Sequence, residues 1–171
     1  MVCVDESGIA TGTRLAYGYA PRGERCEEHA PYRAGRRTSL LGWTGLSGSH
    51  VVPRVGSVDA DAFEEFVRDH LAPSLSGGEI VVWDNHQIHK RASVRQMIED
   101  RGATLVWQPR YSPETNTCEW MWAKVKRQIK RARADTAPAL RAALELAMAS
   151  VSAADTEGWL RGCGYHLTPN A

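Results

Sequence analysis

The spacing of apolar and polar residues divides the chain into a strand-rich first third and a longer part that alternates strands with helices. Short β-strands are predicted at residues 1–6 and 14–20, where tyrosines of the second segment alternate with small residues. Residues 38–46 and 50–55 flank a turn signal and predict a β-hairpin. The first third is therefore expected to form an antiparallel meander, with residues 24–36 as an exposed polar connection.

The period of the pattern changes after this meander. Apolar residues at helical spacing predict a helix over residues 59–71, with Asp59 as its N-cap and Pro73 as its stop. Continuous apolar runs at residues 79–84 and 103–107 are typical of buried strands. Further helices are predicted over residues 90–101, 113–133 and 136–150. This succession predicts an α/β fold in which parallel strands follow the antiparallel ones, in one domain over residues 1–171.

Composition narrows the class of protein. The chain has 171 residues, of which 43% are hydrophobic and 24% charged, as in soluble globular proteins. Its first residues lack the pattern of a signal peptide, and its apolar runs are too short to span a bilayer. The four cysteines are scattered, which argues against a disulfide framework or a zinc ribbon and favours a cytoplasmic location, with no membrane partner.

Charge is distributed unevenly along the chain. The net charge is only +1, but residues 84–133 contain 11 Lys and Arg against 5 Asp and Glu. Such a chain can present a basic face to a polyanion while it stays soluble as a whole.

Three acidic residues occupy positions suited to chemistry. Asp5 lies at the end of the first predicted strand, Asp84 at the end of a central strand, and Glu119 near the start of a long helix. Each alone is explained as a turn former, a helix cap or a partner of the helix dipole. If the two strands are neighbours, however, the acids converge, and a convergence of three carboxylates favours a bound Mg²⁺ or Mn²⁺.

The sequence segments around these three acids resemble the motifs of a known family. They are Val-Asp-Glu-Ser-Gly at residues 4–8, Val-Trp-Asp-Asn-His-Gln-Ile-His at 82–89, and Tyr-Ser-Pro-Glu-Thr-Asn-Thr-Cys-Glu-Trp at 111–120. They resemble the three catalytic blocks of DDE transposases of the mariner superfamily, in particular those of bacterial insertion sequences. The 34 residues between Asp84 and Glu119 match the spacing in that family, and Gly-Cys-Gly-Tyr at 162–165 resembles its C-terminal end.

The resemblance implies an RNase H-like fold with a mixed five-stranded sheet flanked by helices. It implies that Asp5, Asp84 and Glu119 bind the metal, as two Mg²⁺ or Mn²⁺ ions. The third block departs from the family where Thr117 replaces a proline, and Glu114 is the competing ligand. Glu6 neighbours Asp5 in a strand and is expected to point to the opposite face.

Three further residues match supporting positions of the family: Asn85, His89 and Asn116. Asn85 is expected either to orient a ligand or to make a buried hydrogen bond. His86 and His89 have the i, i+3 spacing of metal ligands, but no third soft ligand accompanies them, so a role without metal is favoured.

The helix that carries Glu119 also carries a row of cations. At 100° per residue, Lys126 and Lys130 project close to the direction of Glu119, and Arg127 lies on the outer face. We expect these three residues to bind DNA phosphates, with a solvated helix face as the alternative.

The favoured function is metal-dependent phosphoryl transfer, which would cleave DNA at transposon ends and join the ends to a target, with a homodimer as a possible assembly. Two alternatives remain open: an idle transposase remnant that still binds DNA or a partner, and an RNase H-like nuclease. The family carries helix-turn-helix modules before the catalytic domain, and here the first strand begins at residue 1. We therefore expect this region to be absent or to be supplied by a separate polypeptide.

Overall fold

Five strands form one mixed sheet in the order β3-β2-β1-β4-β5. The computed structural model describes residues 1–31, 35–109 and 112–166. The strands are β1 (Val2–Ala10), β2 (Arg37–Gly45), β3 (Gly48–Val55), β4 (Ile80–Trp83) and β5 (Thr104–Trp107). β1, β2 and β3 pair antiparallel, whereas β4 is parallel to both β1 and β5. The predicted five-stranded sheet, the predicted hairpin and the predicted later strands are therefore confirmed.

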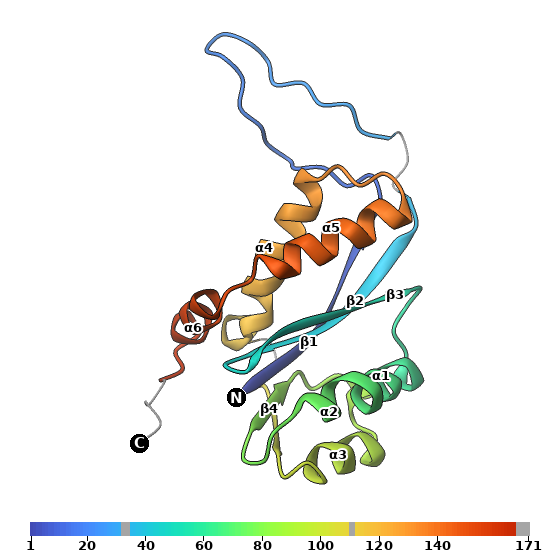
Figure 1. The fold of residues 1–171 in the computed structure, drawn as a ribbon, viewed down its shortest axis with the longest axis vertical. Coiled ribbons are helices and arrows are strands. Elements are labelled where there is room, and N and C mark those ends of the chain that lie inside the picture. The colour runs from blue at the N-terminus through green and yellow to red at the C-terminus, as the bar shows by residue number, and fades with distance from the viewer. Residues whose placement is uncertain (32–34, 110–111, 167–171) are drawn as a thin grey trace.

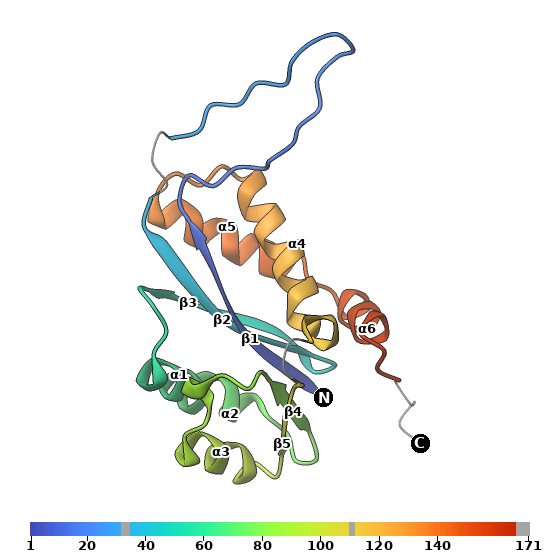
Figure 2. The same cartoon turned by 180° about the vertical axis from the view of Figure 1, so that it is seen from behind.

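Helices cover both faces of this sheet (Figures 1 and 2). One layer contains α1 (Ala60–Phe66), a π-helical turn η1 (Val67–Leu71), α2 (Ala72–Ser74), the 3₁₀ turn η2 (Gln87–His89) and α3 (Ala92–Glu99). The other contains the 3₁₀ turn η3 (Pro113–Thr115), α4 (Thr117–Arg131) and α5 (Ala137–Ala149), with α6 (Ala153–Gly162) beside the start of α4. None of the helices in the described segments is long and apolar enough to cross a membrane.

The alternation of side chains along β1 builds two cores. Val2 and Val4 pack with Phe63 and the other apolar residues of the α1–α3 layer. Cys3 and Ile9 point the other way and pack with the apolar stripes of α4 and α5. β1 is thus buried on both faces at its start and fixes the two helical layers relative to each other.

β1 is longer than the sequence predicted. We expected it to end before Ser7 and Gly8, but it continues to Ala10. Every residue of β1 has a partner in β2, with Gly8 opposite Ser39. The long antiparallel ladder outweighs the local turn signal, and Asp5 therefore lies inside the strand.

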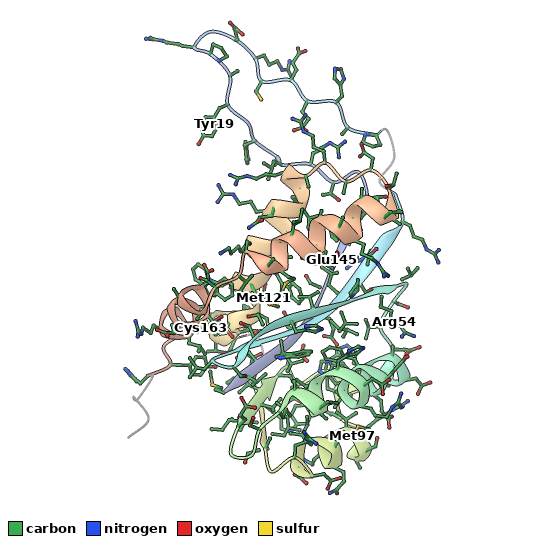
Figure 3. The ribbon with its side chains drawn as sticks, viewed as in Figure 1. Tyr19, Arg54, Met97, Met121, Glu145 and Cys163 are labelled. Atoms are coloured by element: carbon green, nitrogen blue, oxygen red, sulfur yellow. The ribbon has the colours of Figure 1, made fainter. Side chains whose placement is uncertain are left out.

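The strand predicted at residues 14–20 is wrong. That segment is irregular and belongs to a long connection that projects from the body of the molecule (Figures 1 and 2). Tyr17 and Tyr19 are fully exposed, and Figure 3 shows Tyr19 on the projecting part. Alternation alone cannot make a strand without a partner ladder. The exposed connection predicted at residues 24–36 is confirmed where it is described; residues 32–34 lie outside the described residues.

The base of this projection is fastened to the connection between α4 and α5. Arg14 Nη2 lies 2.8 Å from Asp135 Oδ1, and Arg133 Nε lies 2.8 Å from Glu28 Oε1. The backbone N–H of Gly12 donates to the carbonyl of Ala134 at 2.9 Å. These ion pairs and this hydrogen bond therefore hold the start of the projection against the α4–α5 connection.

Two helices differ from their predicted bounds, and a further helix was not predicted. Asp59 caps α1 as expected, by accepting from Ala62 N at 2.9 Å, but the helical segment continues through Pro73 to Ser74. The π-helical turn before Pro73 accommodates its missing N–H group. The helix predicted from residue 113 begins only at Thr117, because η3 and its cap intervene. The sequence analysis missed α6, which begins with a capping box between Ser152 and Asp155.

Candidate active site

The three predicted acids line one cleft although they come from distant parts of the chain. Asp5 lies in β1, Asp84 directly follows β4, and Glu119 lies in the first turn of α4. We call this the acid cleft; its volume is about 420 Å³. Its lining comprises Asp5, Asp84, Asn85, His86, Gln108, Pro109, Ser112, Pro113, Asn116 and Glu119. The parallel pairing of β1 with β4 brings Asp5 and Asp84 to the same edge of the sheet.

Asp5 is held by α4. Its Oδ2 accepts a hydrogen bond of 2.9 Å from the indole Nε1 of Trp122, which is buried one helical turn after Glu119. Burial raises the pKa of Asp5 to about 7; the Trp122 hydrogen bond opposes this shift, and the Glu119 and Glu6 carboxylates add to it. A cation in the acid cleft would relieve this cost of an ionised Asp5.

Asp84 is exposed and held from the opposite side by a histidine. Its Oδ1 lies 2.7 Å from Nδ1 of His89 and accepts from the backbone N–H of His86 at 2.9 Å. The His89 hydrogen bond lowers the pKa of Asp84, although partial burial opposes this effect. Asp84 is therefore ionised at neutral pH and keeps its second oxygen free of these two contacts.

His89 links Asp84 to Glu6. The His89 ring is buried against Phe63, and its Nε2 lies 2.6 Å from Glu6 Oε1. Burial would lower the pKa of His89, but the hydrogen bonds to Asp84 and Glu6 raise it to about 9. A protonated His89 donates through both nitrogens, one toward Asp84 and one toward Glu6. That His89 does not bind a metal stays a prediction. Glu6 lies off the acid cleft, as expected from its neighbouring position in the strand.

Asn116 determines how α4 enters the cleft. Its buried side chain caps the helix by accepting from Cys118 N at 3.0 Å. Glu119 follows in the first turn, where it is exposed and lines the acid cleft together with Asp84 and Asp5. Glu114, the competing ligand, is exposed on η3 and does not line the cleft. Asn85 lines the acid cleft and is half-buried. Tyr111 of the third block lies outside the described residues.

The predicted cations continue from Glu119 along α4. Lys126 and Lys130 are half-buried, whereas Arg127 is exposed. Burial lowers the pKa of Lys126; attraction by Glu119 and Asp5 opposes this shift, and repulsion by Lys130 and Arg37 adds to it. Lys126 therefore lies within electrostatic reach of both the acid cleft and other cations. The helical spacing of Met121, Trp122, Val125, Gln128, Ile129 and Ala132 predicts one core-facing stripe on α4. Met121, Trp122, Val125 and Ile129 of this core stripe are buried, but Ala132 is exposed at the helix end.

The acid cleft offers carboxylate oxygens, which are the type of ligand atom that a hard divalent cation prefers. Carboxylate oxygens are the ligands that Mg²⁺ and Mn²⁺ prefer, and the three acids provide them from three elements. Within residues 1–31, 35–109 and 112–166, no three His, Cys, Asp or Glu side chains are already closed into a metal-binding group.

Comparison with known proteins decides the family. The profile of the family described as "DDE superfamily endonuclease" matches residues 1–141. The chain belongs to this family. This membership confirms the resemblance that the three sequence blocks carry.

The chain is also similar to proteins named as transposases. It is 28% identical over 120 residues to the Transposable element Tcb1 transposase of Caenorhabditis briggsae; the alignment covers 66% of this chain and 44% of that protein. It superposes on the Mos1 transposase paired-end complex with a TM-score of 0.72 and 21% identity, over 95% of this chain and 51% of that one.

The Mos1 catalytic domain gives a TM-score of 0.64 with 17% identity, over 95% of this chain and 74% of that domain. These structural likenesses confirm the RNase H-like fold. The chain spans about half the length of the full relatives that it matches.

Two residues of this site were missed as participants. Trp122 looked like an ordinary member of the α4 core stripe, and nothing in its spacing showed that its N–H group reaches Asp5. Glu6 was placed correctly on the opposite face, but its contact with His89 joins residues 83 positions apart. The packing of α4 on β1 brings Trp122 to Asp5, and the pairing of β1 with β4 brings His89 to Glu6.

Proposed function

We propose that this chain is the catalytic domain of a transposase, which cleaves DNA at transposon ends and transfers the freed end to a target. The observation that carries the proposal is the convergence of Asp5, Asp84 and Glu119 on one cleft in a member of the DDE endonuclease family. Structures of Mos1 transposase with Mn and with Mg support a divalent metal as cofactor.

The three acids would hold two divalent ions, Mg²⁺ or Mn²⁺, which supply activation of the attacking oxygen and charge stabilisation of the leaving oxygen. Asp84 is suited to a shared position because it is exposed and its second oxygen is free of the contacts with His89 and His86. His89 fixes the Asp84 carboxylate on one side, and Trp122 fixes that of Asp5. Asn116 sets the start of the helix that presents Glu119.

DNA is the proposed partner, and Lys126, Lys130 and Arg127 would contact its phosphates. The Mos1 complexes with transposon ends support this proposal. A homodimer and a helix-turn-helix region, on this or a separate polypeptide, complete the proposed assembly. The proposed place of action is the cytoplasm of a bacterium, at the nucleoid, in line with the resemblance to transposases of bacterial insertion sequences.

Nicking of a supercoiled plasmid tests the proposal. The protein is expected to convert supercoiled to open-circular DNA with Mn²⁺ or Mg²⁺ but not with EDTA. Asp84→Asn should abolish nicking while the thermal transition stays cooperative. Glu114→Gln, a change of the same kind outside the acid cleft, should leave nicking intact. Nicking that survives in Asp84→Asn would disprove the assignment of the site.

A second assay distinguishes the alternatives. A transposase joins the 3′-hydroxyl of a precut oligonucleotide to a plasmid, whereas an RNase H-like nuclease cleaves an RNA–DNA hybrid without joining. An idle remnant would bind DNA and perform neither reaction. Joining that depends on Asp84 supports the transposase; hybrid cleavage without joining would favour the nuclease.

A further inference from the structure

A second cleft lies on the other side of β1 and meets the acid cleft at Asp84. Its volume is about 640 Å³, and Asp84 and His86 line both clefts. We call it the arginine cleft, because its lining includes Arg36 and Arg37 in addition to Glu6, Ser7 and Ser57. The active-site edge therefore continues past Asp84 into a polar groove that the three acids do not explain.

The two arginines of this groove lack acidic partners. Among the described residues, neither Arg36 nor Arg37 forms an ion pair, whereas seven other arginines do. Both are exposed at the start of β2. A guanidinium group presents a planar fork of donors that matches a phosphate, and here both forks are available.

Gly8 determines where Arg37 lies. A Cβ atom on Gly8 would come within 2.6 Å of Arg37 Nε and 2.8 Å of Nη2. The Arg37 guanidinium thus lies directly on the backbone of β1, two residues beyond Glu6. A side chain at position 8 would displace it, so the glycine in the middle of this strand positions a cation beside the cleft.

The neighbouring edge of β1 is open. β4 pairs with β1 only at Val2 and Cys3, and no other described strand covers that edge over residues 4–10. Lys126 of α4 lies within electrostatic reach of Arg37, so the positive potential of this edge includes both tracks of cations.

Charge also differs between the two clefts. The acid cleft is lined by three carboxylates and no Lys or Arg among the described residues, so a nucleic-acid strand needs compensating cations where it leaves the scissile position. The arginine cleft provides them directly beyond Asp84.

We propose that the arginine cleft binds the phosphodiester backbone of the DNA strand that continues past Asp84, with Arg36 and Arg37 as its phosphate contacts. This proposal rests on the proposed DNA-cleaving function and adds a second binding track on the Glu6 side of β1. It is distinct from the track along α4 that Lys126, Lys130 and Arg127 would form.

Binding of a fluorescent DNA duplex in EDTA, over a series of salt concentrations, tests the proposal without any need for activity. Arg36→Ala with Arg37→Ala should lower the slope of log affinity against log salt by about 2 and weaken binding on the order of tenfold at 0.1 M salt. The matched control is Arg95→Ala with Arg101→Ala, which removes the same charge from the α3 region, outside both clefts.

Two further variants test position rather than charge. Arg36→Lys with Arg37→Lys keeps both charges, so the salt slope should persist while affinity falls several-fold through loss of the guanidinium fork. Gly8→Ala keeps the charges but displaces Arg37, and should lower the slope by about 1. Melting curves of all variants show whether the fold is retained.

The possible results show whether the arginine-cleft proposal or the proposed cleavage function has failed. Three results would overturn the proposal that the arginine cleft binds DNA. They are an unchanged salt slope in the double alanine variant, an equal loss of salt slope in the Arg95 and Arg101 control, and no DNA binding by the unaltered protein. Absence of metal-dependent nicking, together with binding that depends on Arg36 and Arg37, would overturn the cleavage function alone.

Discussion

The indole Nε1 of Trp122 donates a 2.9 Å hydrogen bond to Oδ2 of Asp5, and this contact joins the first strand of the sheet to the helix that presents Glu119. Two of the three acids are thereby positioned by the same helix, one through its first turn and the other through a residue one turn later. A shift of α4 would move Glu119 and release Asp5 together.

Trp122→Phe is expected to reduce the affinity for Mn²⁺ about 10- to 100-fold, as removal of a hydrogen bond to a metal ligand commonly does. The loss of the donor should also raise the pKa of Asp5 further, so that protons compete with the metal more strongly. A Mn²⁺ titration of plasmid nicking measures the effect. Trp43→Phe alters a buried indole in the α1–α3 core and should leave the titration midpoint unchanged. Equal midpoints for Trp122→Phe and the unaltered protein would contradict this role.

Asp5→Asn is expected to stabilise the metal-free protein at and above neutral pH. Burial raises the pKa of Asp5 from 3.8 to about 7, so the folded state binds a proton that the unfolded state has released. The cost grows as the pH rises from about 4 to about 7 and is constant above that range. Urea unfolding in EDTA at pH 4 and pH 8 measures it; the gain should be about 4 kcal/mol at pH 8 and near zero at pH 4. The same gain at both pH values would argue against a charge effect.

Glu6→Gln is expected to shift the alkaline loss of stability to lower pH. The pKa of His89 is raised to about 9, so its charged contacts contribute fully below pH 6.5 and are lost as the pH rises through about 9. Without the Glu6 charge this loss should begin nearer pH 7, with about 1 kcal/mol less stability at pH 8. Urea unfolding from pH 6 to 10 measures the shift. Glu64→Gln removes a carboxylate paired with Arg91 and should leave the alkaline profile unaltered; coincident profiles for Glu6→Gln and the unaltered protein would refute the prediction.

Lys126→Ala with Lys130→Ala is expected to weaken DNA binding and to lower its salt slope by about 2, because both ammonium groups continue the line of Glu119 along α4. Anisotropy titrations in EDTA measure the slope. Lys124→Ala removes a lysine of the same helix that pairs with Asp155 at 2.6 Å, and should leave the slope unchanged. If the double substitution leaves the salt slope unchanged, these lysines form a solvated helix face and do not bind DNA.

Local chemistry predicted the elements whose partners are close in the chain. The hairpin of β2 and β3, the apolar runs of β4 and β5, and the Asp59 cap depend on a few adjacent residues, and all are present. Predictions failed where a distant partner overrode the local signal. β1 continues through Ser7 and Gly8 because β2 pairs with it, and residues 14–20 stay irregular because no described strand does.

The sequence by itself determined which residue types are available for chemistry: three acids in ordered blocks, a row of cations along one helix, and the apolar stripe that buries one face of that helix. Tertiary structure alone decided the strand order, and with it the neighbours of each acid. Pairing of β1 with β4 places Asp5 beside Asp84, while Trp122, His89 and Arg37 approach from other elements. These contacts join residues far apart in the chain, and their energies depend on burial and distance, which local patterns do not record.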